Sequence, residues 1–228
     1  MTSTAAPSAT SGTDLLRRLA APASTLLGLM AAGVGLYVLP WAAGGGQALL
    51  GYEVIGYLNA HTYDFDGSPS LALYYVSMGT FVFLGASALL SLTTGSRSRR
   101  GRLVAASFTL LAVLLLAAAA WGLFASADPR PSRDEYDFAL VGTIMAVVAV
   151  VVLADVVALA AGAVRVHHGF ALAFVVTTAA LHAFVLLSLR IDPGSMFELK
   201  LFAWVPVAGY LLAAAGVATG LVARLRLP

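Results

Sequence analysis

Six long stretches of apolar residues, separated by shorter polar segments, divide the chain. A helix rises about 1.5 Å per residue, so roughly 20 residues cross the ~30 Å hydrocarbon core of a bilayer. The stretches are continuous rather than alternating, which favours helices over the strands of a transmembrane barrel. The pattern predicts an all-α polytopic integral membrane protein, a bundle of six transmembrane helices at about 23–41, 70–92, 103–125, 138–163, 169–189 and 201–222.

The segment before the first apolar stretch has a different character. Residues 1–20 open with the small, polar run MTSTAAPSATSGT, which has too little apolar surface to order itself, so we expect a short disordered tail. Residues 21–228 then make up one six-helix domain. The first stretch follows basic residues, as in a signal peptide, but it exceeds the 7–15 apolar residues typical of one, which favours a retained helix.

Composition agrees with a chain whose solvent is largely lipid. Of the 228 residues, 60% are hydrophobic and 11% are charged, whereas soluble domains are about 25% charged. The chain has no cysteine, which excludes disulfides, thiolate metal sites and cysteine nucleophiles. Ala and Arg are abundant and Lys is rare, a composition that suggests a bacterial chain. We therefore expect the lipid bilayer of the cytoplasmic membrane as partner, and no nucleic acid.

The basic residues predict the orientation. If the N-terminus lies inside, the inner segments hold Arg17, Arg18, Arg97, Arg99, Arg100, Arg102, Arg165, Arg224 and Arg226, and the outer segments hold Arg130, Arg133, Arg190 and Lys200. Cytoplasmic segments of membrane proteins carry the excess of Lys and Arg. The asymmetry therefore predicts a multi-pass protein with both termini in the cytoplasm.

Small residues recur at four-residue spacing in the first and last stretches: Gly28 and Ala32, Ala31 and Gly35, and Gly216 and Gly220. Such spacing lets helix backbones approach closely in membranes. Two interpretations stay open, an interface with another subunit or a second copy of the chain, and internal packing of the bundle. The abundance of Ala and Gly favours internal packing.

The long outer loop, residues 42–69, is unusually apolar for a connection. Its Leu and Tyr residues are interleaved with Gly, which predicts a surface-lying or re-entrant segment with at least one helical turn between residues 47 and 60. Glu53, His61, Asp64 and Asp66 form a candidate site there, because His and carboxylates are metal ligands. A cap on the outer face of the bundle is the alternative that the composition favours. No metal is expected, because the sequence identifies no further ligand for such a site elsewhere in the chain.

Asp155 is the residue in the chain whose position most demands an explanation. It lies about 12 Å from the inner end of its span, too deep for so short a side chain to reach water. A carboxylate at the centre of a membrane helix costs about 2.5–3.5 kcal/mol on insertion scales and usually faces the bundle interior with a partner. The residue is therefore either one member of a structural hydrogen bond or part of a proton or cation pathway.

A partner for Asp155 follows from the short turn near VRVHH. With Val166 as the midpoint of an antiparallel pair, Thr177 is level with Asp155, and Thr178 and His182 follow on the next helix. We expect Asp155, Thr177 or Thr178, and His182 to form an intramembrane polar track. The offset between Asp155 and His182 along the membrane normal would be about 7–8 Å.

No enzyme signature is present: the sequence lacks GxSxG, HExxH, Walker A and GxGxxG motifs. We predict no catalytic residue and no cofactor. A haem held by two histidines is disfavoured because only one His lies within the predicted spans. The leading hypothesis is a non-enzymatic accessory or scaffold subunit of a membrane complex, or a homo-oligomer. The alternatives are a small proton- or cation-coupled carrier or channel using Asp155 and His182, and a membrane enzyme acting on a lipid-linked substrate at the outer face.

Overall fold

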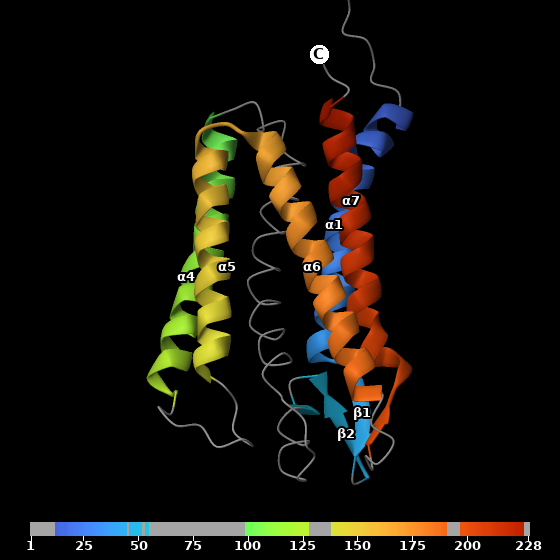
Figure 1. The fold of residues 1–228 in the computed structure, drawn as a ribbon. Helices are drawn as coiled ribbons and strands as arrows, with labels where there is room; N and C mark the ends of the chain where they lie inside the picture. The colour runs from blue at the N-terminus through green and yellow to red at the C-terminus, as the bar shows by residue number, and fades with distance from the viewer. Residues whose placement is uncertain are drawn as a thin grey trace, which may run out of the picture.

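The computed structural model describes residues 12–44, 46–51, 53–54, 99–127, 138–190 and 197–225. Within these ranges the chain forms five long helices and a small sheet (Figure 1). The elements are α1 (Gly12–Tyr37), β1 (Pro40–Gly44), β2 (Gln47–Leu50), α4 (Arg99–Ala125), α5 (Phe138–Ala160), α6 (Val164–Arg190), β3 (Phe197–Leu199), the 3-10 helix η2 (Leu201–Trp204) and α7 (Val205–Leu225).

Five helical segments are long and apolar enough to cross a membrane: Leu19–Tyr37, Arg99–Ala125, Phe138–Ala160, Val164–Leu187 and Leu201–Val222. They correspond to five of the six predicted spans. The remaining predicted span, 70–92, lies outside the described residues. The fold is therefore mostly helical, as the apolar pattern predicts.

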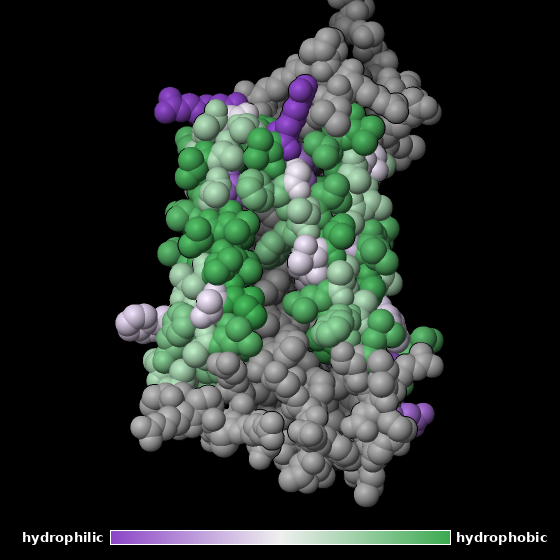
Figure 2. Space-filling view, viewed as in Figure 1, coloured by the Kyte–Doolittle hydropathy of each residue, from purple (hydrophilic) through white to green (hydrophobic). Residues whose placement is uncertain are grey.

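The surface of these helices is apolar as well. Figure 2 shows hydrophobic side chains covering the flanks of the bundle, with hydrophilic side chains at the end where α4 begins. Trp121 is 77% exposed and Phe184 is 60% exposed. Soluble proteins rarely expose apolar surface on this scale. The apolar flanks suit helices that are apolar enough to span a membrane.

The first and last helices pack backbone against backbone. A Cβ atom at Gly28 would collide with the backbone of Gly209 and Ala213, and one at Gly209 would lie 2.5 Å from the nitrogen of Ala32. A Cβ atom at Gly216 would lie 2.6 Å from the nitrogen of Thr25. Only glycine permits so close an approach of α1 and α7.

The five described helices form two groups. α1 and α7 pack along their length and α6 packs on α7, while α4 and α5 form a second pair. α5 contacts α6 much less extensively than it contacts α4, and the two helices diverge from their shared turn in Figure 1. That turn spans residues 161–163 and contains Gly162 with a φ of +93°, a backbone conformation that favours glycine.

A three-stranded antiparallel sheet, in the order β2-β1-β3, lies at the end of the bundle away from the α5–α6 turn (Figure 1). Gly46, with a φ of +81°, lies in the tight connection between β1 and β2. The backbone N–H of Lys200 donates to the carbonyl oxygen of Trp41 at 2.7 Å and so ties the chain before α7 to β1. The apolar pattern did not predict these strands.

A helical turn is expected between residues 47 and 60, and the described part of this range holds both strand and helical residues. Residues 47–50 form a strand, and Gly51, Glu53 and Val54 are helical. The carboxylate of Glu53 accepts a hydrogen bond of 2.8 Å from the backbone N–H of Leu50. Glutamate in the first turn of a helix often satisfies an unpaired N–H in this way.

Candidate functional site

Asp155 and His167 form a buried pair that joins α5 to α6. Asp155 lies near the end of α5, and His167 lies in the first turn of α6. The Nδ1 atom of His167 and the Oδ2 atom of Asp155 are 2.6 Å apart, and both side chains are 0% exposed.

The surroundings of the pair are apolar. Val152 and Leu159, one helical turn to either side of Asp155, are both buried. An ionised carboxylate can only accept hydrogen bonds, so the N–H at Nδ1 of His167 donates to it. Oδ1 of Asp155 finds no hydrogen-bond partner among the described residues. The single charge-assisted bond therefore carries most of the stabilisation that the carboxylate receives there.

The partner of Asp155 differs from the one expected. The turn lies at residues 161–163 and not at Val166, so the residue level with Asp155 on α6 is near 169 and not 177. His167, within two residues of that level, takes the place given to Thr177 or Thr178. Gly162 is the missed signal, because a glycine just after the last helical residue commonly ends a helix.

The expected polar track is not assembled. Fifteen residues of α6 separate His167 from His182, a rise of roughly 22 Å. The hydroxyl of Thr178 donates to the carbonyl oxygen of Phe174 at 2.9 Å, and Thr177 is exposed. The structure thus places Asp155 with His167 at one end of α6 and His182 near the other.

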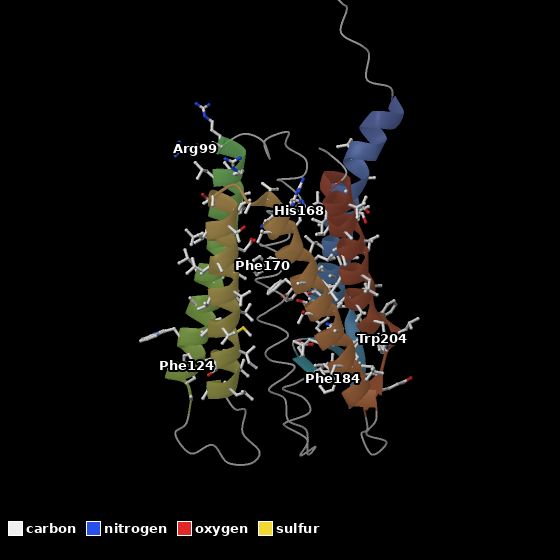
Figure 3. All side chains as sticks on the ribbon, turned by 45° about the horizontal axis from the view of Figure 1, so that its top comes forward. Arg99, Phe124, His168, Phe170, Phe184 and Trp204 are labelled. Atoms are coloured by element: carbon white, nitrogen blue, oxygen red, sulfur yellow. The ribbon has the colours of Figure 1, made fainter. Side chains whose placement is uncertain are left out.

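His168, the next residue, extends the site toward α7. Its ring lies edge-on to that of His167, with 5.7 Å between the ring centroids, and Figure 3 labels it at the start of α6. Its Nδ1 N–H donates to the carbonyl oxygen of Val164 at 2.9 Å. The ring lies 3.8 Å from where a Cβ atom of Gly220 would be, so this glycine leaves room for the imidazole. His167 thus joins α6 to α5, and His168 packs near α7.

His182 belongs to a separate buried cluster, where the sheet meets the helices. Its Nε2 N–H donates to the carbonyl oxygen of Ala203 at 3.2 Å, and its ring lies edge-on to Trp41 with a centroid distance of 4.7 Å. Its Nδ1 finds no partner among the described residues. The contacts join α6, β1 and η2, so this histidine packs the sheet onto the bundle.

The other candidate residues have simpler placements. Gly28, Ala32, Gly35 and Gly216 lie where α1 and α7 meet, and their close contacts are internal to the chain. Glu53 bonds the backbone of Leu50, while His61, Asp64 and Asp66 lie outside the described residues. Within the described ranges, no three His, Cys, Asp or Glu side chains are grouped so that they could hold a metal ion.

The chemistry available to the Asp155–His167 pair is that of proton binding. A carboxylate and an imidazole in hydrogen-bond contact can share, accept and release one proton without any other reactant. Comparison with protein-family models, curated proteins and solved structures finds no match to this chain.

Proposed function

We propose that this chain is a small multi-pass protein of the cytoplasmic membrane that works as a proton-coupled carrier, with Asp155 and His167 as its proton-binding site. The observation that supports the proposal is the 2.6 Å contact between two fully buried ionisable side chains inside helices long enough to span a bilayer. Ionisable residues in such positions commonly belong to proton relays or substrate pathways.

The charge of the pair explains how proton binding would act on the helices. With the proton bound, carboxylate and imidazolium have a net charge of zero. Without it, a neutral imidazole faces a carboxylate, and the buried site carries one negative charge. An unpaired charge in this environment costs several kcal/mol. Loss of the proton therefore favours a conformation in which Asp155 reaches water.

The arrangement of the helices supports a carrier. The pair connects α5, which belongs with α4, to α6, which belongs with α1 and α7. These two groups contact each other less than the helices within each group do. Gain or loss of the proton can therefore alter how the α4–α5 pair packs on the group of α1, α6 and α7. Carriers that expose a site to alternate sides of the membrane rely on such a change.

A proton suits the site better than a metal cation. Zinc sites in proteins use three or four side-chain ligands. The described residues offer one carboxylate and one imidazole in contact here and no larger group of such ligands. A proton is the species that these two side chains can bind without a further ligand. The orientation predicted from the basic residues puts the pair nearer the cytoplasmic side.

Charge movement in reconstituted membranes tests the proposal without knowledge of the carried substrate. Proteoliposomes on a solid-supported membrane receive a rapid pH step, and a buried proton-binding site produces a transient current. We expect a transient in the wild-type protein, none in Asp155→Asn, and a much smaller one in His167→Asn, whose amide keeps a donor near the position of Nδ1.

His182→Gln is the matched control, because it removes a second buried histidine of the same helix that has no part in the pair. Its transient should equal that of the wild type. Protease accessibility first shows that each variant inserts to the same extent. A wild-type transient that survives Asp155→Asn, or an inserted wild-type protein without one, contradicts the proposal.

An accessory subunit is the second candidate, and the sheet favours it. Among the described strands, β2 and β3 are the edges of the sheet, and they lie at the outer end of the bundle in the predicted orientation. Edge strands recruit partner segments by strand addition. A photo-crosslinking residue at the exposed Gln47 should then trap a defined partner, while one at the exposed Val104 on α4 should trap lipid. Identical crosslinks from both positions would argue against this candidate.

A further inference from the structure

We infer that Arg102, together with Arg99 and Arg165, binds the phosphate of an anionic phospholipid where α5 turns into α6. The inference shares with the proposed function only the assumption that the helices cross a membrane. It uses neither Asp155 nor His167 as a ligand. Arg99 and Arg102 are three residues apart in the first turn of α4 and lie on one face of that helix.

Arg102 lies over the glycine turn. Its guanidinium carbon is 3.6 Å from where a Cβ atom of Gly162 would be, and its Nε is 3.8 Å from the same point. The Nε atom is shielded from solvent and finds no hydrogen-bond acceptor among the described residues. A buried N–H without an acceptor is costly. A phosphate oxygen beside the turn is an acceptor that a guanidinium binds well.

Charge at this end of the bundle favours an anion. Arg99, Arg100 and Arg165 are exposed, and Figure 3 shows Arg99 projecting from the start of α4. Asp155, the acid nearest to the turn in sequence, is bonded to His167. Figure 2 shows hydrophilic side chains gathered at this end, above an apolar flank.

The apolar flank indicates a lipid and not free phosphate. Leu103 is 47% exposed and Val104 is 56% exposed, directly after the basic residues of α4. Val166, beside Arg165, is also exposed. A molecule that binds here therefore meets cations at the helix end and apolar side chains along the helix. Basic pockets between membrane helices on the cytoplasmic side recognise anionic headgroups in this way.

Native mass spectrometry of the full chain in detergent tests the inference. Phosphatidylglycerol and phosphatidylcholine with the same acyl chains are added in equal amounts, and the retained lipid is counted. We expect the wild-type protein to retain more phosphatidylglycerol than phosphatidylcholine. Arg102→Gln should lower phosphatidylglycerol retention by roughly fivefold, the size expected for one basic residue near an anionic surface. Arg165→Gln should show a smaller loss.

Lys200→Gln is the matched control, since it removes one positive charge at the opposite end of the bundle; its lipid retention should equal that of the wild type. Arg102→Lys keeps the charge without the two-pronged donor geometry and should retain an intermediate amount. Equal retention of the two lipids, or an equal loss in Arg102→Gln and Lys200→Gln, overturns the inference. So does displacement of the lipid by excess inorganic phosphate, which would identify a phosphate site. Lipid retention is measured independently of the transient currents after a pH step, so failure of one proposal can be distinguished from failure of the other.

Discussion

The indole Nε1 of Trp41 donates a hydrogen bond of 2.7 Å to the carbonyl oxygen of Gly35. The carbonyl groups in the last turn of a helix have no partner within the helix. A side chain from β1 therefore satisfies one of those at the end of α1, and the same ring packs against His182 and against the backbone of Gly51. Trp41 therefore helps to attach the sheet to the bundle.

Replacing Trp41 by Phe keeps an aromatic ring but removes the donor. We expect Trp41→Phe to lower the free energy of unfolding by roughly 1–2 kcal/mol, because the carbonyl of Gly35 stays buried without its bond. Unfolding in mixed micelles followed by circular dichroism measures the change. Trp121→Phe is the control, since Trp121 is largely exposed, and should change little. Equal effects of the two substitutions would contradict the role of the hydrogen bond.

The contact between α1 and α7 predicts a strong effect of a single added side chain. Gly28→Val should destabilise the bundle by roughly 3 kcal/mol, because the colliding atoms belong to the backbone of α7 and cannot turn aside. Gly122→Val provides the comparison: this glycine is also helical, and a Cβ atom there meets nothing within 4 Å. Thermal unfolding in detergent should separate the two variants clearly, and a stable Gly28→Val protein would show that the helices do not pack as described.

The Asp155–His167 pair predicts strong coupling between two substitutions. His167→Leu leaves the carboxylate buried without its partner and should cost about 3 kcal/mol. Asp155→Leu leaves a histidine that can be neutral and should cost about 1 kcal/mol. The double variant should be more stable than His167→Leu alone, because no buried charge remains. A double-mutant cycle of unfolding free energies measures this coupling, and simple additivity would show that the pair contributes nothing.

The distribution of basic residues predicts the orientation, which reporter fusions can measure. Alkaline phosphatase folds only outside the cytoplasm, so a fusion after residue 130 should be active and one after residue 98 should be inactive. The reverse pattern would invert the topology. Activity at both positions would contradict the predicted number of spans.

The sequence alone determined the helices and their apolar surface. Continuous apolar runs long enough to cross a bilayer have few structural solutions, because each backbone N–H and C=O needs a partner inside the same segment. For this reason the predicted spans 103–125, 138–163 and 201–222 lie close to α4, α5 and the η2–α7 segment. The four-residue spacing of Gly28 and Ala32 likewise predicted a close contact with another helix. It did not predict that this helix would be α7.

The tertiary structure decided which strands pair and which side chain contacts Asp155. The sheet joins β1 to β3, segments more than 150 residues apart, and no local pattern encodes that pairing. The partner of Asp155 depended on where α5 ends: moving the turn from Val166 to Gly162 shifts the level residue on α6 by about eight positions, from Thr177 toward His167. Each position along a helix turns a side chain by about 100°, so an error of a few residues at a turn selects a different partner. Apolar periodicity is a local property of the chain, whereas contacts across a turn depend on its register.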